Sequence, residues 1–350
     1  MTRRVIPALC MLVSIAAVAA PASAQSNSRI QAFFEQKVGL SQDQIVDIRH
    51  GIPVVKVLPP RTQEEVFLFG AVYIHAAPES YLQLILNFDR ESRLPDVLAL
   101  GVFGDPPRLS DLNGFSLDYD DIRDLQKCHP GDCLIKLSGG AMEELQRTVD
   151  WSAPDASRRV NQYIQIEALH RLLAYQREGN RALGVYNDKR DPAEVDRQFA
   201  YMLSYSTALP EQLPDFYHYL LSYPQAKPAN VEDRFYWTKV RFGLKPTLRV
   251  IHLATMRGGP EDDVAYAIAE KQLYSSHYFD TALDLSFCVR GRDNFRHPGF
   301  YLIVAMGSEM SALAGLKGEV IRKVAVGRSA SDLQAALTNV RNVLERAQNP

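Results

Sequence analysis

The spacing of apolar residues along the chain alternates between a period of two and a period of three to four, which predicts both strands and helices. Residues 66–75 are rich in β-branched and aromatic side chains and predict a strand, and Pro78 is placed to begin a helix. Polar and apolar residues alternate in residues 235–242 and 247–255, which predicts paired strands with one buried face. Further strands are expected at residues 54–58, 97–103, 115–119, 134–137, 273–279, 283–289, 301–306 and 320–326.

Helical spacing dominates two regions of the chain. Residues 151–230 are expected to be mostly helical, with a start signal at Asp191-Pro192 and proline punctuation around a helix at residues 214–223. Residues 332–347 predict a long amphipathic C-terminal helix. Its apolar stripe consists of Leu333, Leu337, Val340 and Leu344.

Residues 70–81 (GAVYIHAAPESY), together with the terminal helix at residues 331–347, resemble the helix-grip fold of the START-like (polyketide cyclase and lipid transfer) superfamily. The resemblance implies an α+β fold, in which a curved antiparallel sheet grips the C-terminal helix and encloses a cavity for an apolar ligand. The two matching segments cover under half of the chain. The helical stretch at residues 151–230 departs from a compact family member and is expected to be an insertion. Fold analogy does not choose between binding, transfer and catalysis.

The N-terminal segment predicts export. Arg3 and Arg4 precede an apolar run at residues 5–20, and the small residues that end at Ala24 suit signal peptidase. The run is short for a membrane anchor, which is the alternative interpretation. We therefore expect a bacterial periplasmic or secreted protein with no stable membrane span after cleavage. The expected parts are a signal peptide at 1–24, the first half of an α+β domain at 25–150, a helical insertion at 151–230 and the second half at 231–350.

Composition excludes the unusual classes of protein but names no activity. The chain has 350 residues, of which 46% are hydrophobic and 23% charged, with a net charge of −2, so a disordered chain, a collagen and a coiled coil are excluded. Removing the signal leaves 37 basic and 41 acidic residues, a net charge of −4, which gives no reason to expect a nucleic acid partner. An acidic group lacks the glycine and final glutamate of a calcium loop, so we expect a solvated surface there. It consists of Asp118, Asp120, Asp121 and Asp124.

Three cysteines remain after signal removal. Cys128 and Cys133 flank a Pro-Gly turn, and in an oxidising compartment this spacing favours a local disulfide. Free thiols, or a metal site with His129 and Asp132, are the alternatives. Cys288 lies in an apolar run and is expected to be a buried small hydrophobe.

Candidate chemistry is sparse, because the common short motifs of hydrolases, zinc peptidases and nucleotide enzymes are absent from the sequence. The best polar cluster lies at residues 271–280, where His277 could act as a base with Tyr274 or Asp280. A half-buried aromatic strand with a structural histidine explains the same residues. No cofactor or metal is expected.

Side chains that could bind a ligand lie on the predicted strands. Histidine and tyrosine can donate hydrogen bonds to a ligand head group, although a structural role is the favoured interpretation of the two histidines. The candidates are His75, His252, Tyr236 and Tyr278.

Three functions follow from these observations. The first is a periplasmic binding module that holds a lipid-like or other apolar small molecule. The second is an enzyme that acts on an apolar substrate through His277. The third is an envelope protein that binds another protein through the tyrosine-rich helices of residues 151–230.

Overall fold

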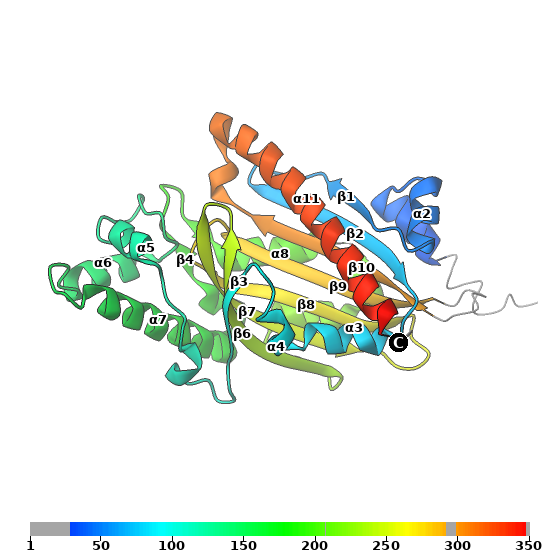
Figure 1. The fold of residues 1–350 in the computed structure, drawn as a ribbon, viewed down its shortest axis with the longest axis horizontal. Coiled ribbons are helices and arrows are strands. Elements are labelled where there is room, and N and C mark those ends of the chain that lie inside the picture. The colour runs from blue at the N-terminus through cyan, green and yellow to red at the C-terminus, as the bar shows by residue number, and fades with distance from the viewer. Residues whose placement is uncertain (1–28, 207, 292–298, 348–350) are drawn as a thin grey trace, which may run out of the picture.

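The computed structural model describes residues 29–347 except 207 and 292–298, so the predicted signal peptide at 1–24 lies outside the described residues. Within them, eight strands form one antiparallel sheet in the order β1-β2-β10-β9-β8-β7-β6-β3 (Figure 1). The strands are β1 (Val54–Leu58), β2 (Glu65–Ile74), β3 (Val97–Val102), β6 (Val231–Phe242), β7 (Lys245–Arg257), β8 (Val264–Ser275), β9 (Thr281–Gly291) and β10 (Gly299–Glu309). A separate small ladder joins β4 (Val185–Tyr186) to β5 (Ala193–Glu194).

Helices lie on both sides of this sheet. They are η1 (Phe33–Val38), α2 (Gln42–Arg49), α3 (Pro78–Ile85), α4 (Phe88–Glu91), η2 (Leu109–Leu112), α5 (Tyr119–Leu125), α6 (Gly139–Thr148), α7 (Ala156–Glu178), η3 (Gly179–Leu183), α8 (Val195–Tyr205), α9 (Ala208–Gln212), α10 (Pro214–Ser222), η4 (Ser311–Leu313) and α11 (Gly315–Arg346). No described helix is long and apolar enough to cross a membrane.

One face of the sheet, called the front face below, carries α11, α3 and α4 (Figure 1). Helix α11 crosses this face diagonally and packs on β1 and β2. Gly70 in β2 allows the close approach, because a Cβ atom there would lie 2.8 Å from Cδ1 of Leu337 and 3.0 Å from Cδ2 of Leu333. The apolar stripe of the terminal helix therefore buries itself against a strand that has no side chain at the crossing point.

The opposite, back face is covered by two groups of helices. Helices η1 and α2 pack on β2 and β10 through Phe34, Phe69 and Tyr301. Helices α7, α8 and α10 pack on β6 to β9 with buried aromatic side chains such as Phe199 and Phe216. Strand β2 is buried on both sides, which explains its continuous apolar sequence.

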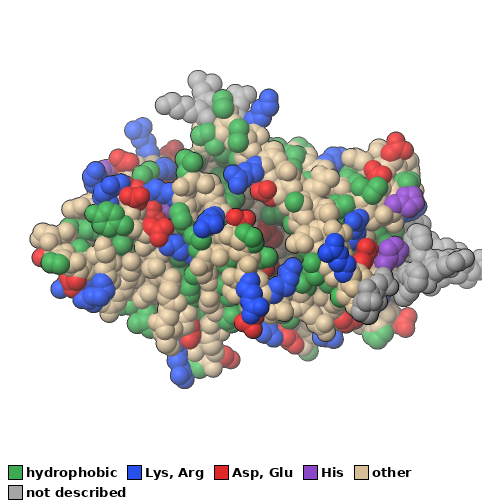
Figure 2. Space-filling view, viewed as in Figure 1, with side chains coloured by type: hydrophobic (Ala, Val, Ile, Leu, Met, Phe, Trp, Pro, Cys, Tyr) green, Lys and Arg blue, Asp and Glu red, His purple; other side chains and the backbone are tan. Residues whose placement is uncertain are grey.

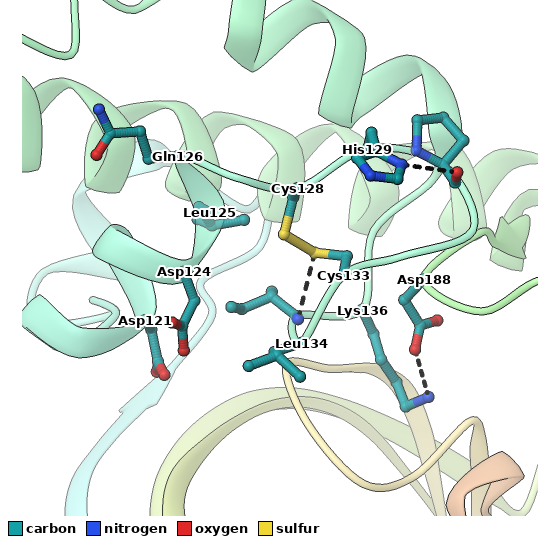
Figure 3. The surroundings of a disulfide bond; sticks show 12 residues. Asp121, Asp124, Leu125, Gln126, Cys128, His129, Cys133, Leu134, Lys136 and Asp188 are labelled. Atoms are coloured by element: carbon teal, nitrogen blue, oxygen red, sulfur yellow. Dashed lines mark hydrogen bonds and ion pairs between the residues drawn. A yellow bond between two sulfur atoms is a disulfide. The ribbon is translucent and has the colours of Figure 1, made fainter.

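The predicted disulfide is confirmed. Cys128 and Cys133 are bonded in the loop between α5 and α6 (Figure 3), so the free-thiol and metal alternatives do not apply to them. The same loop is tied to the segment after β4, since Gly131 N–H donates to Asn187 O at 2.7 Å and Cys133 N–H donates to Asp188 O at 3.0 Å. Cys288 is buried on the front face, as expected.

The α+β class, the large antiparallel sheet and the C-terminal helix agree with the sequence-based prediction. Five predicted details are wrong. Residues 320–326 belong to α11 rather than to a strand, and residues 115–119 and 134–137 are not strands. Helix α8 begins at Val195 rather than at the predicted Asp191-Pro192 signal, whose following residues pair as β5. Strand β8 ends at Ser275, so His277 lies in the loop that follows it.

Candidate functional site

The catalytic candidate His277 contacts a carboxylate and a backbone carbonyl rather than Tyr274 or Asp280. Its Nε2 lies 3.1 Å from Oδ2 of Asp121, and its Nδ1 lies 3.1 Å from the carbonyl oxygen of Leu134. Asp121 also accepts from Lys245 Nζ at 2.8 Å. Burial raises the pKa of Asp121, but the hydrogen bonds from His277 and Lys245 outweigh it and lower that pKa overall. The sequence predicted a solvated acidic surface that included Asp121. That prediction is wrong for Asp121, which is a buried ion-pair residue.

The other two catalytic candidates lie in separate environments. Asp280 pairs with the buried Lys136 and accepts from Ser311 N–H at 2.6 Å. Tyr274 is buried on the back face, with its ring facing those of Phe115 and Tyr186. No hydrogen bond or ion pair among the described residues joins His277 to either of them.

Two of the ligand-binding candidates support local structure. His75 follows β2, and its backbone N–H donates to Oε1 of Glu345 in α11 at 3.0 Å. The hydroxyl oxygen of Tyr278 accepts from the backbone N–H groups of Leu244 and Lys245, both at 2.8 Å. Tyr278 therefore holds the turn between β6 and β7.

His252 belongs to a buried polar cluster on the back face. Its Nε2 lies 2.8 Å from Oδ1 of Asp233, and its Nδ1 lies 2.9 Å from the hydroxyl of Tyr175. A carboxylate only accepts, so Nε2 carries the proton and Nδ1 accepts from Tyr175 O–H. Lys271 lies beside them, and its Nζ contacts the hydroxyl of Tyr175 and the side-chain oxygen of Asn180.

Burial controls the protonation of this cluster. Desolvation lowers the pKa of His252 in spite of its bond to Asp233, and desolvation holds the pKa of Lys271 well below its ordinary value. The rings of Tyr223 and Phe235 pack against His252, with centroids 4.7 Å away in both cases. A relay of this kind can move a proton, but these side chains are closed off from solvent, and we assign the cluster a structural role.

A cavity of about 140 Å³ lies on the front face between the sheet and α11. Its walls are mostly apolar, with Arg249, Asp284, Ser308 and Ser329 as polar members. The apolar and backbone lining comes from Val66, Leu68, Val240, Phe242, Phe279, Ala282, Met306 and Gly307. Figure 2 shows this face, with acidic side chains (red) set into a recess near its middle.

Polar side chains extend from this cavity along the front face. Glu270 on β8 lies directly opposite Asp284 on β9 in the ladder, and the hydroxyl of Tyr236 donates to Oε2 of Glu270 at 3.3 Å. Tyr236 is therefore the one ligand-binding candidate from the sequence that belongs to this row. Arg249 on β7 donates from Nε to Oε1 of Gln272 at 3.1 Å. These side chains form a row across the neighbouring strands β6, β7, β8 and β9. Along each strand, residues on the front face alternate with residues on the back face.

Two buried atoms in this row lack partners. Among the described residues, neither Nε2 of Gln272 nor Oγ1 of Thr238 has a hydrogen-bond partner. Gln272 and Thr238 are 2% and 5% exposed, so both atoms are withdrawn from bulk water. Buried polar groups normally find partners, and Gln272, one of the two residues without one, is hydrogen-bonded through its oxygen to Arg249, which lines the cavity.

The two carboxyl groups of the row have raised pKa values. Desolvation, reinforced by the facing Asp284, raises the pKa of Glu270 to about 7. Desolvation also raises the pKa of Asp284 to about 6, and the opposing effect of Arg249 is smaller. No described Lys or Arg lies within ion-pair distance of either carboxyl group. The arrangement can bind a cation or exchange a proton with a ligand near neutral pH.

Sequence reasoning missed Arg249, Glu270, Gln272 and Asp284. A signal was present, because these polar residues occupy the same face of otherwise apolar strands as Tyr236. The described residues contain no group of three or more side chains suited to hold a metal ion. A wider depression of about 660 Å³ lies along η2 and α7, but its Asn161 already bonds the backbone of Leu117.

Comparison with known proteins adds no further constraint. No protein-family model matches the chain, and no curated protein shows significant similarity to it. The candidate site is therefore defined by its geometry alone.

Proposed function

We propose that this protein is an exported, START-like helix-grip protein that binds a small apolar molecule between its sheet and α11. The observation that carries the proposal is the cavity of about 140 Å³, which combines apolar walls with Arg249 and Asp284. Ligand sites in proteins typically combine an apolar lining with a few polar groups in this way.

The order of elements supports the proposed fold. Strand β2 leads directly into the proline-started helix α3, five antiparallel strands follow later in the chain, and α11 returns across β2. In this proposal, the sheet curves around α11 and the helices from α7 to α10 form an insertion. These helices cover the back face and leave the front cavity to α11.

The cavity size limits the ligand. Drug-sized ligands occupy about 300–1,000 Å³, whereas an engineered apolar cavity of about 150 Å³ holds benzene. A cavity of about 140 Å³ therefore suits a six-membered ring or a short chain. A longer lipid would have to leave its tail outside the space seen here.

Export is supported by the disulfide between Cys128 and Cys133, which persists in an oxidising compartment. The competing proposal of a protein partner lacks the feature that it needs. Among the described residues, no large apolar side chain of residues 151–230 is exposed, because the tyrosine-rich helices bury their rings or cover them in part.

Cyclohexanol is a suitable probe of the proposed site, because its ring is small and its head is uncharged. We expect it to shift the NMR methyl resonance of Met306, which lines the cavity. Ala282→Phe should abolish the shift by filling the cavity, and Ser308→Leu serves as a second filling variant.

Val46→Phe is the matched control, because Val46 is 44% exposed on α2 over the back face. It should leave cyclohexanol binding unchanged. An unaltered Met306 resonance in the wild-type protein, or equal binding by the filled variants once they are shown to be folded, would contradict the proposal.

A further inference from the structure

We propose that the front-face cavity selects a small organic cation: a protonated amine that carries a hydrogen-bond acceptor beside it, such as an amino alcohol. This inference rests on the proposed function and names the chemical class of its ligand. Two independent features support it. One is an acid pair that forms no ion pair with a described Lys or Arg, and the other is a buried amide donor without an acceptor among the described residues.

The acid pair supplies acceptors for an ammonium group. Asp284 lines the cavity and has no hydrogen-bond donor among the described residues. Glu270 lies opposite to it across β8 and β9 and receives only the long bond from Tyr236. Side chains directly opposite in an antiparallel pair have Cβ atoms about 5 Å apart, so one ammonium group can reach both carboxyl groups.

The free donor comes from Gln272. Arg249 Nε can only donate, so the atom of Gln272 that faces it is the oxygen, and the NH₂ group is the atom left without a partner. The side chain is 98% buried, since Gln272 is 2% exposed. A buried N–H group that lacks an acceptor is costly, and an oxygen of the ligand would satisfy it.

The charges around the cavity favour a cation over an anion. Arg249 on β7 is the positive group, and its guanidinium is partly used by Gln272 and lies 5.9 Å from the ring centre of Phe279. Three carboxyl groups oppose this positive charge, namely Glu270, Asp284 and Glu91 of α4. In addition to desolvation, the negative charges of Asp284 and Glu91 both raise the pKa of Glu270. The ionised site is net negative, and buried charge needs a compensating partner. An ammonium ligand supplies that partner, whereas a carboxylate ligand would add to the excess.

Three probes with one ring and different heads test the inference: cyclohexylamine, cyclohexanol and cyclohexanecarboxylate, titrated by calorimetry near neutral pH. We expect the amine to bind at least about tenfold tighter than the alcohol, because charge-assisted hydrogen bonds are about twice as strong as neutral ones. The carboxylate should bind weakest. A fourth probe, 2-aminocyclohexanol, should bind tighter than cyclohexylamine, and Gln272→Met should remove that advantage.

Asp284→Asn and Glu270→Gln should reduce amine binding to the level of the alcohol. Glu143→Gln, at an exposed position of α6, is the matched control and should change nothing. Equal affinity for amine and alcohol, or preference for the carboxylate, would overturn the cation inference and leave apolar binding standing. Failure of all the probes to bind would overturn both.

Discussion

The two faces of the sheet bury ionisable side chains in different ways. On the back face, Lys136 meets Asp280 and Asp188, and His252 meets Asp233. Lys271 is buried there as well, where desolvation lowers its pKa and its side-chain nitrogen contacts the uncharged Tyr175 and Asn180.

On the front face, two buried carboxyl groups lie together without an ion-pair partner among the described residues. Glu270 and Asp284 face each other, and no described cation lies within ion-pair distance of them. A protein gains no stability from such an arrangement, because burial penalises the charged form. The comparison teaches that paired polar groups join the loops and strands of the back face to one another, whereas the acid pair of the front face, which lacks an ion-pair partner among the described residues, is the candidate place for a ligand.

The largest expected effect comes from breaking a matched pair on the back face. Asp280→Asn removes the carboxylate that contacts Lys136, whose raised pKa shows that attraction to Asp280 and Asp188 exceeds the opposing desolvation. Breaking a buried ion pair on one side costs about 3 kcal/mol, so urea denaturation should show a loss of that size.

Asp120→Asn is the matched control for this variant. Asp120 forms an exposed pair with Arg123, with its side chain 68% exposed, and such pairs contribute at most about 1 kcal/mol. Equal losses in Asp280→Asn and Asp120→Asn would remove the basis for treating the back-face pairs as structural.

A smaller loss is expected from the disulfide, which fastens the loop between α5 and α6 beside the back-face layer. The double variant Cys128→Ala and Cys133→Ala should lower the free energy of unfolding by about 2 kcal/mol, because the bond closes a short loop. Cyclohexanol binding to the front cavity should be unaffected. A weaker affinity for cyclohexanol in this variant would show that the two faces are coupled.

The sequence predicted those elements whose periodicity matches their burial. Strand β2, the pair β6 and β7, and the C-terminal part of α11 follow from apolar patterns that the packed structure preserves. The strand predicted at residues 320–326 was wrong because its β-branched residues lie in the first half of α11, where Val320 and Val324 are exposed. Local propensity favoured a strand there, and continuity of the helix overrode it.

The candidate site was harder to predict, because it depends on register between strands. Asp284 meets Glu270 only through the pairing of β8 with β9, and the sequence does not reveal this register. A regular strand over residues 271–280 would place His277 and Tyr274 on opposite faces. The pairing of β7 with β8 shifts its register between Val250 and Ile251, and β8 ends at Ser275, so His277 lies in the loop beyond the strand. Tyr236 was identified from its aromatic strand alone, and the acids beside it were not.

The last expected effect has the opposite sign, a gain in stability, and tests the front face. Burial and the facing Asp284 raise the pKa of Glu270 to about 7, whereas an unfolded chain has a value near 4.3. Between these values the folded protein binds the proton more tightly, so the stability that Glu270 contributes is present at low pH and is lost as pH rises toward 7. Glu270→Gln cannot ionise, so its stability relative to that of the wild-type protein should increase steadily as the pH rises from 5 to 8. Urea denaturation of the ligand-free protein measures this, with Glu143→Gln as the exposed control. A destabilised Glu270→Gln at the higher pH would mean that Arg249 already compensates the carboxylate, and the front face would then be as well matched as the back.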